Sequence, residues 1–172
     1  MPRIRVLVSP RFVADAGPLI ALARIGRLDL LRKALGTLEI AQAVEDELRL
    51  DSDMPGATLL RQAVRKDGCI RARTLTAAPV RLGMAVGMGE ASAILLAAER
   101  KALLLIDDRR GRKAAAKRGV ICIGTGRVLL EAKRRGLLTA VGPALQALTE
   151  SGYRLSPALC SRILELAGEA GQ

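Results

Sequence analysis

The strongest constraint on the fold is a series of short apolar segments that alternate with longer segments of helical pattern. The clearest is ALLLI at residues 102–106, which contains no polar side chain. A short run of this kind is typical of a parallel strand that is covered on both faces. Four further segments have strand character: 11–14 (RFVA), 37–41 (TLEIA), 69–73 (CIRAR) and 120–124 (VICIG). Helical patterns fill the intervals, so the sequence predicts an α/β fold with a parallel sheet in which 120–124 is a further buried strand.

Length and composition fit one domain with an aliphatic core. The chain has 172 residues, half of them hydrophobic, and its only Phe and Tyr are Phe12 and Tyr153. We assign residues 1–10 to an N-terminal extension and residues 11–172 to a single domain, whose last part, from Thr125 onward, is predicted to form three helices. No apolar run approaches the roughly 18 residues that span a bilayer, so we expect a cytoplasmic protein without a membrane partner.

The residue types exclude several kinds of chemistry. The chain has no histidine, which rules out imidazole bases, Ser-His-Asp triads and His-ligated zinc. Cys69, Cys122 and Cys160 are far apart and form no CxxC motif, so we expect free thiols. The net charge of +11 favours a polyanionic partner, nucleic acid first, over a basic surface that is merely solvated.

Acidic residues stand where the predicted strands end. Asp15 follows residues 11–14, Asp107 and Asp108 follow residues 102–106, Glu47 lies on the helix after residues 37–41, and Glu90 opens a helix. The carboxyl ends of parallel strands meet at one edge of a sheet, so these acids can converge. Two like charges about 4 Å apart repel by roughly 4 kcal/mol at an effective dielectric of 20, so such a cluster needs protons or a divalent cation such as magnesium. The alternative for each acid is a helix cap or a surface charge.

Four segments in this order resemble a known family: VADAGPLIALARIGRLDLL, GMGEASAILLA, LLLIDDRRGRKAA and VICIGTGRVLLEAKRRGL. Together they resemble PIN-domain proteins, and in particular the toxin component (VapC-type ribonuclease) of type II toxin–antitoxin pairs. The resemblance spans residues 11–168. It implies a PIN-like α/β/α sandwich with a short parallel sheet and C-terminal helices. It also implies an endoribonuclease that depends on Mg²⁺ or Mn²⁺, with RNA as substrate and a cognate antitoxin as protein partner.

The same resemblance implies a set of site residues. The four catalytic acids are Asp15, Glu47, Glu90 and Asp108. The metal ligands come from Asp15, Glu90, Asp108 and its rival Asp107. Glu45 and Asp46 are alternatives to Glu47 in the alignment. The family commonly carries Ser or Thr two positions after its first acid, where this chain has Gly17, so the site lacks one hydroxyl near the metal.

A basic run follows the paired aspartates. Its residues Arg109, Arg110, Arg112 and Lys113 are predicted to hold the RNA backbone beside the metal, and a solvated helix face is the alternative. The apolar helices are also compatible with a homodimer. Two other functions stay open. One is a catalytically weak RNA-binding or protein-interaction module, which Gly17 favours. The other is a nucleotide-binding regulator of Rossmann type, for which the glycine fingerprint is missing.

Overall fold

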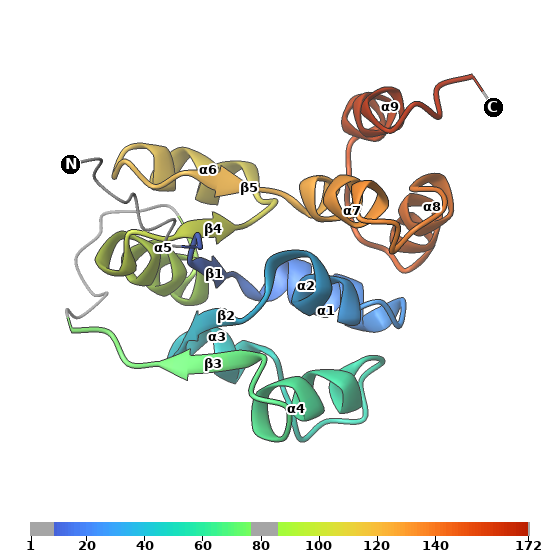
Figure 1. The fold of residues 1–172 in the computed structure, drawn as a ribbon. Coiled ribbons are helices and arrows are strands. Elements are labelled where there is room, and N and C mark those ends of the chain that lie inside the picture. The colour runs from blue at the N-terminus through green and yellow to red at the C-terminus, as the bar shows by residue number, and fades with distance from the viewer. Residues whose placement is uncertain (1–8, 77–85, 172) are drawn as a thin grey trace, which may run out of the picture.

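The computed structural model describes residues 9–76 and 86–171, and in this part of the chain one parallel sheet is surrounded by helices (Figure 1). The strands are β1 (Phe12–Ala14), β2 (Leu38–Ala41), β3 (Ile70–Arg73), β4 (Leu103–Leu105) and β5 (Cys122–Ile123). The helices are α1 (Ala16–Arg24), α2 (Asp29–Leu35), α3 (Gln42–Glu47), α4 (Ala57–Arg65), α5 (Met88–Arg100), α6 (Arg109–Ala116), α7 (Thr125–Arg134), α8 (Gly142–Glu150) and α9 (Pro157–Leu166).

The order of the strands creates a switch point in the middle of the sheet. The order is β3-β2-β1-β4-β5, so the chain builds outward from β1 to β3 and then returns to the other side of β1 with β4. Ala14 pairs with Leu105, and the Asp15 backbone N–H donates to the Leu105 carbonyl at 3.0 Å. The carboxyl ends of β1 and β4 therefore lie side by side, which is where ligands bind in open parallel sheets.

The sheet is covered by helices with apolar faces. Helix α5 contacts β1, β2 and β4, and it buries Ile94 and Leu96 completely. Its many small residues let it approach the strands closely. Helix α7 packs against α2 and α9, and Figure 1 shows α7, α8 and α9 grouped at one end of the molecule. No helix in residues 9–76 or 86–171 is long and apolar enough to cross a membrane.

The predicted α/β class, with a parallel sheet flanked by helices, is confirmed, and the three helices after residue 124 are present. The strand predicted at residues 120–124 is present but shorter, and the prediction that it is buried is wrong. Strand β5 spans two residues at the edge of the sheet, both half-buried, and Ile121 is 67% exposed. An apolar run can serve an edge strand as well as a central one, and only the pairing distinguishes them. Much of the loop predicted at residues 74–88 lies outside the described residues.

Candidate active site at the switch point

Two of the predicted acids cap helices directly after the central strands. Asp15 is the N-cap of α1, and its Oδ2 accepts a hydrogen bond from the Gly17 backbone N–H at 3.4 Å. Asp108 is the N-cap of α6, and its Oδ2 accepts from the Gly111 N–H at 2.8 Å. The capping role is therefore real for both residues. It uses only Oδ2, so it leaves Oδ1 of each carboxylate for another partner.

The two glutamates reach the same region from α3 and α5. Glu47 ends α3, and its Oε1 accepts from the Gly89 N–H at 3.1 Å. Glu90 lies in the first turn of α5, and its Oε2 accepts from the Gly87 N–H at 3.3 Å. The other two candidates for the Glu47 role, Glu45 and Asp46, differ in this respect. Glu45 accepts from the side chain of its own helix neighbour Gln42, and Asp46, exposed like Glu47, accepts no hydrogen bond from Gly89.

Each of the four carboxylates thus accepts a hydrogen bond from the backbone N–H of a glycine. At two of these glycines a side chain would fit only if a neighbouring side chain moved. A methyl group at Gly89 would overlap the carboxylate of Glu47, and one at Gly111 would overlap the Ile106 side chain and lie 3.6 Å from the Glu90 carboxyl carbon. Glycine inside a helix costs up to about 1 kcal/mol relative to alanine. Because these two glycines have no side chain, the Glu47 carboxylate can approach the N-terminus of α5, and the Glu90 carboxylate that of α6.

The four acids interact electrostatically. Burial raises the pKa of Asp15 to about 6, the N–H groups of Ala16 and Gly17 oppose this rise, and the charges of Glu47 and Asp108 add to it. Burial also raises the pKa of Glu90, and the charges of Asp15, Asp108 and Glu47 contribute in the same direction. Asp15 is only 7% exposed. The site therefore concentrates negative charge in a partly dehydrated place, where a proton or a cation is favoured.

The oxygen atoms available suit a hard divalent cation, although they are not gathered tightly. Asp15 Oδ1 is buried and has no hydrogen-bond partner within the described residues. In the same ranges, no group of three or more acidic or cysteine side chains stands close enough together to hold a metal ion. Carboxylate oxygens are the ligands that Mg²⁺ and Mn²⁺ prefer, so the residue types fit such an ion, and the exposed Glu47 and Asp108 side chains would have to turn toward it.

Asp107, the rival of Asp108, is occupied by other partners. Its carboxylate accepts from the backbone N–H of Thr125 at 3.0 Å and from the Thr125 hydroxyl, and it accepts from the Tyr153 hydroxyl at 2.6 Å. Burial and the Asp107 charge raise the pKa of Tyr153, so its hydroxyl stays a donor. Asp107 therefore holds the start of α7 against the C-terminal segment, while Asp108 faces the other acids.

The basic run on α6 divides in the same way. Arg109, Arg110 and Lys113 are exposed, whereas Arg112 is half-buried and donates to the Ile106 carbonyl at 2.9 Å. Of the four side chains predicted to bind RNA, three are free to reach a phosphate in the described structure, and Arg112 supports the chain between β4 and α6.

Comparison with known proteins assigns the fold to a family. The model of the PIN domain family DUF3368 matches residues 11–169, nearly the whole chain. The chain belongs to the PIN-domain family. Among solved structures, a PilT N-terminus domain protein from the hyperthermophilic archaeon Sulfolobus solfataricus P2 is 18% identical, with a TM-score of 0.50 over 68% of this chain and 88% of that one. At that identity the likeness shows the fold alone. A search of curated proteins found no match.

Four further residues of this PIN domain shape the site and were not predicted from the sequence. They are Gly89, Gly111, Thr125 and Tyr153. The two glycines left a signal, because each interrupts an otherwise helical pattern beside an acid, in GMGEA and DDRRG. Thr125 and Tyr153 left none, since only the fold brings them to Asp107.

Proposed function

We propose that this PIN domain is a metal-dependent endoribonuclease that hydrolyses RNA phosphodiester bonds. The observation that carries the proposal is that four carboxylates lie in one region at the switch point, where burial first and their mutual charges second raise the pKa of Asp15 and Glu90. A chain without histidine needs another source of acid–base chemistry, and this cluster supplies it.

In this proposal Asp15 and Asp108 hold the cation most directly, with Glu47 and Glu90 completing the cluster. The free oxygen of Asp15 supports its place as a ligand. A bound Mg²⁺ or Mn²⁺ supplies charge neutralisation at the phosphoryl oxygens and lowers the pKa of water. Asp107 is left as a positioning residue, since its hydrogen bonds fix the path of the chain next to Asp108.

The carboxylates also offer a destination for a proton. Hydrolysis adds the hydroxyl of water to phosphorus and breaks one P–O ester bond, and the remaining proton of the water passes through a base to the leaving oxygen. Glu90 is half-buried with a raised pKa, which brings a carboxylate closer to the range in which it acts as a general base near neutral pH. We assign it that role.

RNA is the substrate that the charge favours. Arg109, Arg110 and Lys113 project from the helix that Asp108 caps, so their cations stand next to the proposed site of cleavage. Backbone contacts of this type give affinity without sequence choice. A toxin role would add a small antitoxin protein that covers this edge of the sheet and blocks access to the acids.

The test is cleavage of single-stranded RNA by purified protein. We expect cleavage with Mg²⁺ or Mn²⁺, none with EDTA, and none for Asp108→Asn. The matched control is Asp46→Asn, which removes an exposed carboxylate one residue from Glu47 and should cleave normally. Activity that persists in EDTA, or equal losses for the two variants, would contradict the proposal.

A second function is favoured by two observations: Gly17 stands where the family carries a hydroxyl, and the carboxylates of the described residues are not drawn together. It is an RNA-binding PIN module with little or no catalysis. Binding of RNA without cleavage under any divalent ion would decide for it.

A further inference from the structure

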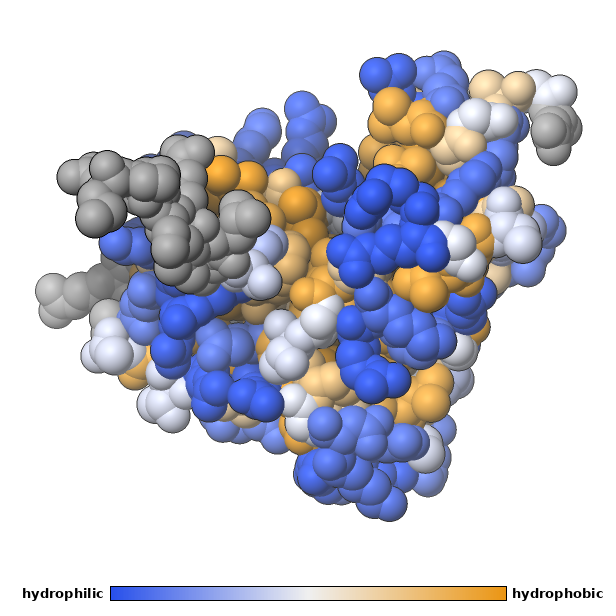
Figure 2. Space-filling view, in the orientation of Figure 1, coloured by the Kyte–Doolittle hydropathy of each residue, from blue (hydrophilic) through white to orange (hydrophobic). Residues whose placement is uncertain are grey.

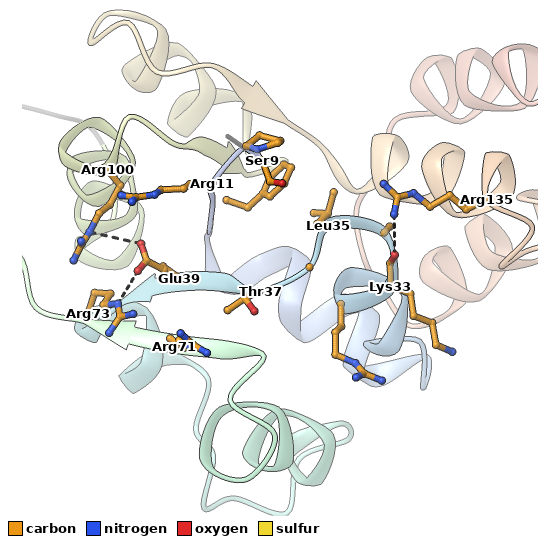
Figure 3. Close-up of a pocket in the computed structure, with 15 residues that line it drawn as sticks. Ser9, Arg11, Lys33, Leu35, Thr37, Glu39, Arg71, Arg73, Arg100 and Arg135 are labelled. Carbon is orange, nitrogen blue, oxygen red and sulfur yellow. Dashed lines mark hydrogen bonds and ion pairs between the residues drawn. The ribbon is translucent and has the colours of Figure 1, made fainter. Parts of the chain in front are cut away.

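A basic pocket lies on a part of the molecule that the proposed active site does not use. It has a volume of about 770 Å³. Its arginines come from separate segments of the chain: Arg11, Arg32, Arg71, Arg73, Arg100 and Arg135. Figure 3 shows the lining side chains arranged around the starts of β1 and β2, and in the same region Figure 2 shows hydrophilic residues around a more apolar centre.

One carboxylate organises part of this pocket. Glu39 of β2 accepts from Arg73 Nε at 2.7 Å, and its other oxygen lies 3.6 Å from Arg100 Nε (Figure 3). The Glu39 side chain is only 18% exposed. A guanidinium carries five N–H donors, and these pairs use one nitrogen of each arginine. The terminal nitrogens of Arg73 and Arg100 remain free of the carboxylate, so Glu39 holds Arg73 by a hydrogen bond and lies near Arg100 without neutralising the pocket.

Three other arginines of the pocket lack an acidic partner in the described ranges. Within residues 9–76 and 86–171, no carboxylate lies within ion-pair distance of Arg11, Arg32 or Arg71. All three are exposed, and Arg71 donates to the Gly68 carbonyl. The pocket therefore holds a clear excess of positive charge in one concave place. Two other cations of its lining, Lys33 and Arg135, pair with Asp29 and Glu131 and add less to this excess.

The basic pocket is remote from the four acids, as the lengths of strand β1 and helix α5 both show. Arg11 precedes β1 and Asp15 follows it, four residues later, which corresponds to roughly 13 Å of extended chain. Glu90 lies in the first turn of α5 and Arg100 is its last residue, which corresponds to roughly 15 Å along the helix axis. A ligand in the pocket is thus not held by the acid cluster.

The lining favours nucleic acid over an acidic protein. Protein interfaces have an apolar core, and the exposed large hydrophobic side chains of the described structure are Met54, Leu59, Met88, Ile121, Leu159 and Leu166. None of them lines the pocket. Interfaces with nucleic acid are more polar and much more positively charged, and arginine matches phosphate geometry with paired N–H donors.

We infer that this pocket, whose lining includes Arg11, Arg32 and Arg71, binds the phosphate backbone of single-stranded RNA as an anchor separate from the site of cleavage. The inference rests on the proposed function only in naming RNA as the shared ligand. Binding through the pocket needs no metal and no chemistry, so it is measured in EDTA.

The experiment compares two triple variants of the full chain by fluorescence anisotropy with a labelled single-stranded oligoribonucleotide. The pocket variant is Arg11→Gln, Arg32→Gln, Arg71→Gln. The control is Arg24→Gln, Lys66→Gln, Arg154→Gln, which removes the same charge from exposed residues that line no described pocket. For single-stranded nucleic acid, each phosphate contact contributes about 0.7 to the slope of log K against log salt concentration. Losing three contacts should therefore lower the magnitude of this slope by about 2 and the affinity by about tenfold. The control variant should change both much less.

A third variant separates charge from misfolding. Arg11→Lys, Arg32→Lys, Arg71→Lys keeps the cations and should keep most of the slope, with melting temperatures recorded for all proteins. Equal effects of the pocket and control variants overturn the anchor, whether or not the protein cleaves RNA. A loss of RNA affinity in the pocket variant but not in the control supports the anchor, even if no RNA is cleaved. The experiment therefore tests the anchor independently of the proposed function.

Discussion

The acid cluster and the basic pocket lie toward opposite ends of helix α5, and they are built in different ways. Each acid is held by a backbone N–H of a glycine, and Asp15 is buried enough for its pKa to rise to about 6. The arginines of the pocket are mostly exposed, and only Arg73 and Arg100 share a carboxylate. Helix α5 favours this arrangement, because its N-terminus attracts the negative Glu90 and its C-terminus the positive Arg100.

The difference indicates what each region can do. Each carboxylate accepts a backbone hydrogen bond that limits its movement, so only a small rearrangement of Glu47 and Asp108 would be needed to bind a small cation beside the buried Asp15. Exposed arginines on long side chains can follow a flexible polyanion, and they stay charged at any pH at which the protein is folded. A variant that alters one region should therefore leave the function of the other intact.

The largest expected effect comes from Asp15→Asn. Asn is as good an N-cap as Asp, so α1 should keep its start. The change removes a desolvated charge beside Glu47 and Asp108. Cleavage should fall at least about 100-fold, beyond the cost of losing an outer-shell partner. RNA binding in EDTA should stay within a few-fold of wild type, because the pocket arginines are unchanged.

The same variant carries a pH signature in the metal-free protein. The folded pKa of Asp15 is raised from 3.8 to about 6, so its contribution to stability is present below pH 3.8 and lost as the pH rises through about 6. The difference between these two pKa values corresponds to a change in the free energy of unfolding on the order of 3 kcal/mol. In urea unfolding with EDTA, the free energy of unfolding of the wild type should fall as the pH rises from 3.8 through about 6. That of Asp15→Asn should fall less. A variant less stable than wild type at neutral pH would make Asp15 a structural cap.

Much of the fold could be predicted because β1 and β4 are compact apolar runs, and β2 is apolar apart from Glu39. The edge position of β5 could not, since Ile121, the residue before it, has the character of a core residue and is nevertheless 67% exposed. The acids at the carboxyl ends of β1 and β4 could be predicted in outline from the same apolar runs. Strand ends are local features of a sequence, so the pattern of apolar runs alone places Asp15 and Asp108 at this edge.

What the sequence did not reveal depends on contacts between distant segments. Asp107 and Asp108 are neighbours of equal chemistry, and what distinguishes Asp107 is its hydrogen bonds from Thr125 and Tyr153, 18 and 46 residues away. The basic pocket was missed for the same reason. Arg11, Arg32 and Arg71 each look like ordinary surface charge, and only the fold shows that they share one concave place.

A smaller effect is expected from Gly89→Ala, which tests how the acids are held. The added methyl group overlaps the Glu47 carboxylate, which can move, so the fold should survive and helix α5 should gain up to about 1 kcal/mol. The stabilisation of the protein by Mg²⁺ should weaken, with a drop in affinity of about tenfold. Gly87→Ala is the control, because no atom of residues 9–76 or 86–171 lies within 4 Å of a methyl group there and the N–H that holds Glu90 is kept. Equal Mg²⁺ responses would place Glu47 outside the metal site.

The smallest effect is expected from Gly17→Ser, which sharpens the acid side of the comparison. A side chain at residue 17 starts 3.6 Å from Asp15 Oδ2 and 3.8 Å from the Tyr153 hydroxyl, ordinary contact distances, so the substitution should fit. It returns the hydroxyl that the family carries there. We expect a gain of a few-fold in Mg²⁺ affinity, measured as the rise in melting temperature with added ion. Gly17→Ala adds the same carbon without the oxygen and should match wild type. If Ser and Ala behave alike, the hydroxyl contributes nothing beside Asp15, and the departure at Gly17 does not weaken the site.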